Sequence, residues 1–202
     1  MLAAFAICIS RTCCTSDLVV PFLGAGRSHS RLADVVGFFA HYLHLRIRLT
    51  DTMSLLDALE CVNKQLNAAI EHSDAGRVAK AMPEMLVGGG FSWEPWLSSF
   101  KERTSGNPVE PPKMKAATKN EKLKIRRFSV DPMVQRDDER FDLDMVLGLS
   151  EGGQGIGGAC FYRADLFQKA TMERFARNLR LFVTLFIESP EMLVQACPLE
   201  AT

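Results

Sequence analysis

One stretch of the chain, residues 35–49, constrains the fold more than any other. Its side chains alternate in character over more than ten residues. The odd positions hold Phe39, His41, Leu43, Leu45, Ile47 and Leu49, and the even positions hold Phe38, Ala40, Tyr42, His44, Arg46 and Arg48. Because successive side chains of a strand point to opposite faces, this alternation predicts a β-strand with one apolar face and one mixed face.

His41 interrupts the apolar face of this predicted strand, between Phe39 and Leu43. A polar group in that position needs a hydrogen-bond partner or a wet cavity. From the pattern alone, the favoured interpretation is a core histidine that bonds a neighbouring carbonyl group. The alternative is a histidine that lines a functional cavity.

Composition places the chain among ordinary globular proteins. Its 202 residues suffice for one domain that buries about 70% of its unfolded surface. Lys and Arg total 24, as do Asp and Glu, so no net charge favours nucleic acid or an acidic surface as a partner. No run reaches the roughly 18–20 apolar residues of a membrane helix, and the apolar stretch 1–10 lacks the basic start and cleavage site of a signal peptide.

The cysteine pattern gives no sign of a metal site. The chain has six cysteines, at positions 8, 13, 14, 61, 160 and 197, without a CxxC pair or a Cys/His pair at zinc-ligand spacing. We therefore expect reduced, mostly buried thiols, as in a cytoplasmic protein, and no bound zinc.

Hydrophobic periodicity predicts both helices and strands along the chain. Helices are expected at 2–12, 54–71, 77–86 and 168–188, and strands at 17–23, 35–49, 91–100 (interrupted at Pro95), 123–134, 141–149 and 159–163. Ser54 with Asp57, and Asp165 with Gln168, are expected to cap the helices that follow them. Pro21 indicates an edge strand or a bulge.

Three motifs favour plain structural interpretations. Gly153, Gly155 and Gly158 fit the GxGxxG spacing, but a strand rather than a helix is predicted after them, which favours a hairpin turn over a dinucleotide site. The basic run 113–127 overlaps a lysine- and proline-rich stretch (103–124), and no aromatic residue lies between Phe100 and Phe128, which favours a solvated insertion over a nucleic-acid contact. His72 and Asp74 follow a predicted helix, so a helix-end histidine is favoured over a cleft loop.

Six segments, taken in order, nevertheless resemble the condensation domains of nonribosomal peptide synthetases. The family reads D-I-V-V-G-x-x-x-A-G-R and then I-G-x-F-V-N-T-L-x-L-R, where this chain has Asp17-Leu18-Val19-Val20, Ala25-Gly26-Arg27 and the stretch from Val36 to Arg46. Further matches are Glu71–Asp74 with H-Q-D-x-P-F-E, Phe141–Asp144 with F-D-L-x, Tyr162–Phe167 with Y-N-x-D-L-F, and Thr171–Phe175 with a helix that begins T-I-E-R.

The resemblance implies an α/β (α+β) fold like one lobe of the chloramphenicol acetyltransferase type, with a mixed sheet flanked by helices. In the family, two such lobes form a V with the active site in the tunnel between them, and an acceptor amine attacks a donor thioester to make an amide bond. The implied partners are a peptidyl carrier protein and an N-terminal condensation lobe, with no nucleic acid and no membrane. No cofactor is implied to bind directly, since the phosphopantetheine arm of the carrier brings the substrates.

The chain also departs from the family pattern. It has no adjacent histidine pair, so the HHxxxDG motif of the N-terminal lobe is missing. We therefore expect residues 1–202 to form a C-terminal lobe, with an insertion at about 103–124, that is inactive alone. His41 and Tyr42 replace the family's Asn and Thr; with Phe39 and Arg27 they are the expected tunnel-lining residues. His72 and Asp74 are expected in a loop near the cleft, and no catalytic residue is assigned. The alternative function is a docking module without chemistry.

Overall fold

The structure is a computed structural model that describes residues 1–27, 30–32, 34–73, 89–93, 128–135, 144–152 and 155–200. Three predictions fall on residues outside this set: a helix at 77–86, a strand that continues past residue 93, and an insertion with a basic run. Asp74 also lies outside this set.

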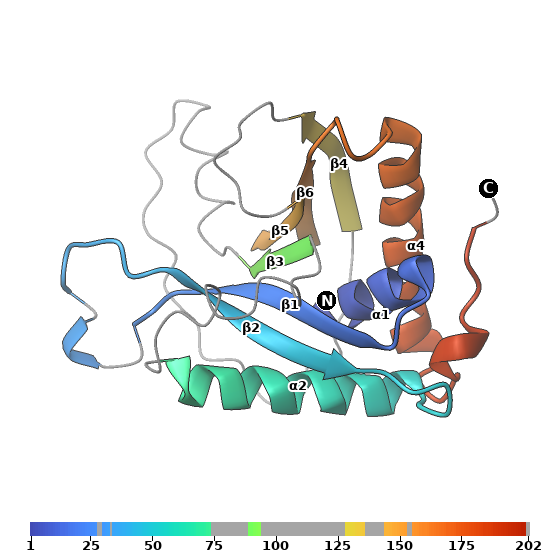
Figure 1. Cartoon of the computed structure of the whole chain (residues 1–202), viewed down its shortest axis with the longest axis horizontal. Coiled ribbons are helices and arrows are strands. Elements are labelled where there is room, and N and C mark those ends of the chain that lie inside the picture. Colours follow the sequence, from blue (N-terminus) through green and yellow to red (C-terminus); the bar gives the residue numbers. More distant parts are fainter. Residues whose placement is uncertain are drawn as a thin grey trace.

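The described strands form one mixed sheet of six strands in the order β2-β1-β3-β5-β6-β4 (Figure 1). Their bounds are Asp17–Gly24 (β1), His41–Arg48 (β2), Gly89–Trp93 (β3), Phe128–Gln135 (β4), Met145–Gly152 (β5) and Gly155–Tyr162 (β6). The pairs β1–β2 and β5–β6 are antiparallel, whereas β1–β3, β3–β5 and β4–β6 are parallel. The predicted mixed sheet is confirmed.

Strand β2 keeps the predicted alternation but is shorter than the pattern suggested. Leu43, Leu45 and Ile47 are buried, while Arg46 and Arg48 on the other face are exposed. The strand begins at His41 because its partner β1 ends at the opposite residue, Gly24. Without a partner strand the preceding residues leave the sheet, and Phe38 is 91% exposed.

The edge position predicted for the strand that contains Pro21 is wrong, since β1 lies between β2 and β3. The ladder with β3 comprises only Phe22 and Leu23. Pro21 precedes this ladder, so its missing N–H removes no bond to β3.

Three long helices accompany the sheet: α1 (Leu2–Cys13), α2 (Leu55–Glu71) and α4 (Lys169–Glu188). Helix α1 contacts both α2 and α4, and α2 runs along β2 (Figure 1). Short 3₁₀ turns lie at Ser30–Leu32 (η1) and Val194–Ala196 (η5). No helix among the described residues is long and apolar enough to cross a membrane.

Helix α1 lies in the middle of the core, and its residues 2–10 are all buried. The Phe5 ring contacts the rings of Phe91 in β3 and Phe175 in α4, with centroids 5.6 and 5.9 Å apart. Gly89 in β3 makes room for this packing, because a Cβ there would lie 3.3 Å from Ile9 and 3.1 Å from Met145. Burial of this apolar surface is the main force that holds helices and sheet together.

The two predicted helix caps have different outcomes. In α2 the Ser54 hydroxyl accepts the Asp57 N–H, and the Asp57 carboxylate accepts the Ser54 N–H, so the capping box is confirmed. The cap predicted for Asp165 is wrong: its carboxylate accepts from Arg163, and Gln168 takes the N-cap position without a side-chain bond. The buried apolar face of α4 comprises Met172, Phe175, Leu179, Phe182 and Val183, and Phe186 is half-buried.

Gly155 and Gly158 of the glycine motif lie in strand β6, within the antiparallel β5–β6 pair that the hairpin interpretation predicts. Strands β5 and β6 pair antiparallel up to Gly152 and Gly155, and no helix opens there. A Cβ at Gly158 would lie 2.1 Å from the Gly148 carbonyl oxygen, so this glycine permits close approach of two strands rather than of a ligand.

All six cysteines are free. Cys8, Cys160 and Cys197 are buried, Cys61 is half-buried, and Cys13 and Cys14 are exposed, so burial extends to fewer thiols than predicted. Burial raises the pKa of Cys160 to about 12. Among the described residues, no group of three or more Cys, His, Asp or Glu could hold a metal ion.

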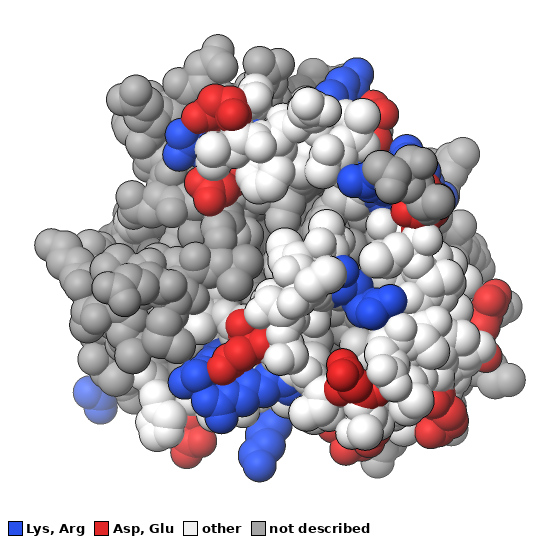
Figure 2. Space-filling model, turned by 45° about the vertical axis from the view of Figure 1, so that its right-hand side comes forward, with Lys and Arg blue, Asp and Glu red and all other residues white. Residues whose placement is uncertain are grey.

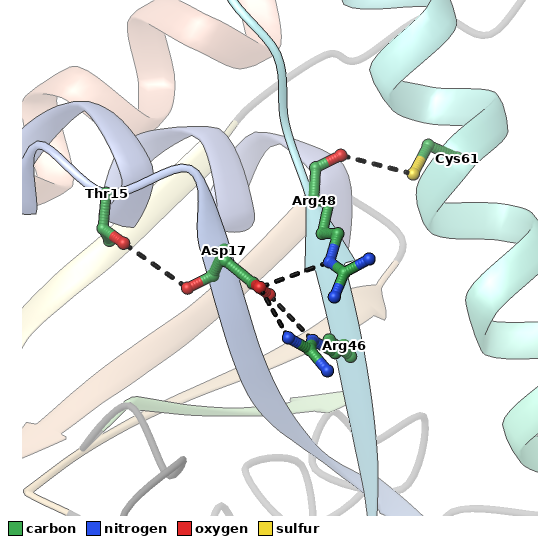
Figure 3. Close-up of polar contacts among 5 residues, drawn as sticks. All are labelled: Thr15, Asp17, Arg46, Arg48 and Cys61. Carbon is green, nitrogen blue, oxygen red and sulfur yellow. Dashed lines mark hydrogen bonds and ion pairs between the residues drawn. The ribbon is translucent and has the colours of Figure 1, made fainter.

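An ion-pair cluster joins the start of β1 to the end of β2 (Figure 3). The Asp17 carboxylate accepts from Arg46 at 2.7 Å and from Arg48 at 3.2 Å. These bonds, that from Arg46 first, lower the pKa of Asp17 to about 2. On the other side of β2, the Cys61 thiol of α2 reaches the Arg48 carbonyl oxygen.

Candidate functional site

Arg27 organises the connection between β1 and β2. Its guanidinium donates to the carbonyl oxygens of Leu32, of Val35 at 2.9 Å and of Gly37 at 3.3 Å. The same group lies over the Phe39 ring, with 4.7 Å between Cζ and the ring centroid. Planar guanidinium groups combine such forked bonding with stacking on aromatic faces. Arg27, which follows β1, is therefore bonded to described residues that lie shortly before β2.

Gly26, the residue before this arginine, has φ +64°, which favours glycine over residues with a side chain. A Cβ at this position would lie 1.9 Å from the Phe39 carbonyl oxygen and 3.0 Å from Nδ1 of His41. The missing side chain lets the chain entering the connection touch the chain leaving it.

His41 begins β2 and contacts the same carbonyl. Its Nδ1 lies 3.1 Å from the Phe39 oxygen. A carbonyl oxygen can only accept, so Nδ1 carries the proton, and in the neutral ring Nε2 is left with its lone pair. Nε2 is buried and has no hydrogen-bond partner within the part of the chain that the structure describes. The predicted hydrogen bond to a neighbouring carbonyl group is thus present at Nδ1, while the lone pair of Nε2 can still accept a hydrogen bond.

Three of the four residues predicted to line a tunnel therefore lie together: Arg27, Phe39 and His41. Tyr42 pairs with Leu23 and, as the next residue of the strand, points to the opposite face from His41. His44 shares the Tyr42 face, and burial lowers its pKa.

His72 is an exposed residue at the C-cap of α2, where its backbone N–H donates to the Ala68 carbonyl at 3.1 Å. The helix-end interpretation of this histidine is confirmed. In Figure 1 this end of α2 and the β1–β2 connection both lie toward the left of the view.

The site offers one histidine oriented by a carbonyl, beside a fixed cation and an aromatic ring. A single oriented histidine can accept a hydrogen bond or a proton from a ligand. Figure 2, which brings the right-hand side of Figure 1 forward, shows acidic and basic side chains interspersed over that part of the described surface. Sequence reasoning missed Gly26 and the carbonyl acceptors of Arg27; the only signal for them was a glycine directly before an arginine in a predicted loop.

Comparisons with known proteins agree with this geometry. The chain is 28% identical over 203 residues to an isonitrile lipopeptide synthase of Mycobacterium tuberculosis, an alignment that covers 96% of this chain and 7% of that protein. The structure resembles a four-domain nonribosomal peptide synthetase bound to AMP and glycine, with a TM-score of 0.71 and 18% identity over 96% of this chain and 15% of the other.

The first condensation domain of the CDA synthetase also superposes, with a TM-score of 0.64 and 15% identity, over 99% of this chain and 41% of that chain. The chain thus spans less than half the length of each of these proteins. The family model described as Condensation domain matches residues 1–199. Nearly the whole chain matches that model in sequence and the solved condensation domain in fold, and the protein therefore belongs to the condensation-domain family.

Proposed function

We propose that this chain is the C-terminal lobe of a condensation unit that joins carrier-bound aminoacyl or peptidyl thioesters through an amide bond. The family match over residues 1–199 supports this proposal. Condensation domains of nonribosomal peptide synthetases work with carrier-protein domains, and the partner here would be a peptidyl carrier protein whose phosphopantetheine arm holds the substrate. The cytoplasmic location expected from the cysteine pattern stays a prediction.

The reaction forms one C–N bond and breaks one C–S bond. The acceptor amine attacks the donor thioester carbonyl, the amine gives up a proton, and the carrier thiol leaves. A base must lie within about 3 Å of that amine. The chain has four histidines and no adjacent pair, so we propose that a separate segment supplies HHxxxDG and that this chain is inactive alone.

The observation that carries the proposal is the cluster of Gly26, Arg27, Phe39 and His41, which occupies the family's A-G-R and F-V-N-T segments. We propose that Arg27, Phe39 and His41 form part of the tunnel wall. His41 stands where the family has asparagine, so it replaces a neutral amide with a basic nitrogen whose lone pair is free to accept a substrate N–H.

Reconstitution tests the proposal. The chain is incubated with carrier-bound donor and acceptor thioesters, with and without a supplied N-terminal lobe that carries HHxxxDG, and amide product is measured by mass spectrometry. We expect product only with the supplied lobe, and a loss of about tenfold or more in His41→Ala, the size of one general hydrogen-bonding contribution. His44→Ala, on the opposite face, is the matched control. Product from the chain alone, or equal rates for both variants, would contradict the proposal.

A docking module without chemistry is the second candidate. It is favoured by the exposure of Val36 (101%) and Phe38 (91%) in a connection that Arg27 holds fixed. Exposed apolar side chains on a rigid segment are typical of contact sites. In a pull-down with carrier protein, Phe38→Ser should weaken capture and His41→Ala should not. If catalysis with a supplied lobe is absent while capture persists, this second function holds.

A further inference from the structure

A cavity of about 360 Å³ lies at the end of the β1–β2 pair that is remote from His41. It is formed where α1, the segment entering β1, the segment leaving β2 and η5 meet, and its lining includes Ser10, Arg11, Cys14, Thr50, Asp51 and Gln195. The eight-residue length of β1 puts it about 20 Å from His41, so it is separate from the proposed tunnel wall.

Arg11 is a cation without an anionic partner. Its Nη2 donates to the Cys197 carbonyl oxygen at 3.3 Å. Its Nε is buried without a hydrogen-bond partner, and none of the ion pairs between described residues includes Arg11. A half-buried guanidinium is stabilised by an anion that satisfies its remaining donors. The carbonyl groups at the C-terminal end of α1 and the Cys197 carbonyl oxygen offset the positive charge of Arg11 only in part.

The other lining groups narrow the choice of anion. Thr50 brings a hydroxyl group that can donate to an oxyanion while it accepts from Thr52, whereas the Ser10 hydroxyl already donates to the Thr15 carbonyl oxygen. Asp51 brings a carboxylate into the same cavity, which disfavours a dianion such as phosphate more strongly than a monoanion. A planar carboxylate matches the guanidinium fork, and the volume of about 360 Å³ leaves room for a small carboxylate together with water.

We propose that this cavity is a binding site for a small carboxylate, with Arg11 as the anchoring cation. The site does not depend on the proposed condensation function. An ammonium group on the same ligand would pair with the Asp51 carboxylate. The test therefore distinguishes a free amino acid from a simple acid such as acetate as the ligand.

Cys14 provides a reporter inside the cavity, and the exposed Cys13 beside it, absent from the lining, provides the control. Iodoacetate and iodoacetamide alkylate the same thiolate by displacing iodide, but only iodoacetate carries a carboxylate. The ratio of the two rates at one cysteine cancels that thiol's own reactivity. The rates are measured on the full chain by tandem mass spectrometry, in Cys13→Ser and Cys14→Ser backgrounds.

We expect the iodoacetate-to-iodoacetamide ratio at Cys14 to exceed that at Cys13 by roughly fivefold, the effect of one partly screened charge-assisted bond. Arg11→Gln should abolish this difference, whereas Arg31→Gln, which removes a charge from the exposed η1 turn, should preserve it. In the unchanged chain, acetate should slow alkylation of Cys14 and leave Cys13 unaffected.

Glycine separates the two sources. Protection by glycine at lower concentration than acetate, lost in Asp51→Asn, identifies an amino acid, and equal protection identifies a simple acid. Equal rate ratios at both cysteines, no protection by either compound in the unchanged chain, or stronger protection by phosphate would each overturn the proposal. The competition needs no variant, so it stands even if Arg11→Gln does not fold.

Discussion

The guanidinium of Arg27 stacks over the Phe39 ring at 4.7 Å while it bonds three carbonyl oxygens between the two residues. One side chain thus joins the end of β1 to the residues just before β2. The position of His41 depends on this contact, because the carbonyl that orients its ring belongs to Phe39.

Replacing Arg27 tests how far it fixes that connection. Arg27→Ala should lower the free energy of unfolding by about 1–2 kcal/mol, from the lost carbonyl bonds and the lost stacking. Urea denaturation measures the change, and hydrogen exchange at the Val35 amide should quicken. Arg31→Ala, in the exposed η1 turn, is the control and should change neither quantity. An unaltered rate of hydrogen exchange in Arg27→Ala would show that Arg27 is not needed to keep the connection in place.

Gly26→Ala should be more damaging than Gly24→Ala. At Gly26 a side chain meets the Phe39 carbonyl oxygen at 1.9 Å in a left-handed conformation, whereas at Gly24 it meets the flexible Leu43 side chain at 3.2 Å. We expect a loss of about 2 kcal/mol or more for Gly26→Ala and roughly 1 kcal/mol or less for Gly24→Ala. Chemical denaturation of both variants measures the two losses of stability. Equal losses would mean that neither the left-handed backbone at Gly26 nor its contact with the Phe39 carbonyl oxygen is important.

The Asp17 cluster should contribute stability that depends on pH. Its pKa of about 2 in the folded chain lies below the ordinary value of 3.8. A lowered folded-state pKa stabilises the protein above the unfolded pKa, and this contribution fades as pH falls from about 4 through 2. Asp17→Asn should therefore be less stable than the unchanged chain at pH 6 and equal to it near pH 2. Asp34→Asn serves as the exposed control, and a constant difference for Asp17→Asn at both pH values would refute the assignment.

The capping box of α2 gives a prediction about side-chain chemistry. Ser54→Ala removes the oxygen that accepts the Asp57 N–H and should cost about 1 kcal/mol of folding free energy. Ser54→Gly, which retains N-cap backbone freedom, should cost only about a few tenths of a kcal/mol. Thermal unfolding of the two variants compares them, and a reversed order would exclude capping as the reason for this serine.

Phe5 should be among the most sensitive positions of the core. It is fully buried between Phe91 and Phe175, so Phe5→Ala removes two ring contacts and leaves a cavity. The expected loss is about 3–5 kcal/mol, against well under 1 kcal/mol for Leu199→Ala at an exposed site. Calorimetry checks both, and a small effect at Phe5 would mean that α1 does not lie in the core as described.

Periodicity predicted most of this fold because its signal is local. Burial of one face produces the alternation at Leu43, Leu45 and Ile47 in β2 and the apolar stripe of α4. Both patterns can be read directly from the order of apolar and polar residues. The interior place of β1 was missed because the partner of a strand is not encoded in that strand. Similarly, Asp165 can cap a helix or pair with Arg163, and only the folded chain brings that arginine into reach.

The candidate site was predictable only in part. Arg27, Phe39 and His41 were identified from the resemblance, but their mutual contacts depend on how the connection closes. Backbone carbonyls carry no sequence signal, so neither the Phe39 oxygen that orients His41 nor the acceptors of Arg27 could be read in advance. Tyr42 was grouped with His41 although adjacent strand residues face opposite ways.

The short central strand has a consequence for how the chain acquires its shape. β3 has five residues, begins 65 positions after β1 ends (89 − 24), and joins β1 to β5 by parallel pairing on both sides. The β1–β2 hairpin can form early from neighbouring residues, but its inner edge stays open until distant segments arrive. Such long-range closure slows folding. On a ribosome, that open edge of β1 would persist until β3, which ends at residue 93, has emerged, and it would be exposed to chaperones for that time.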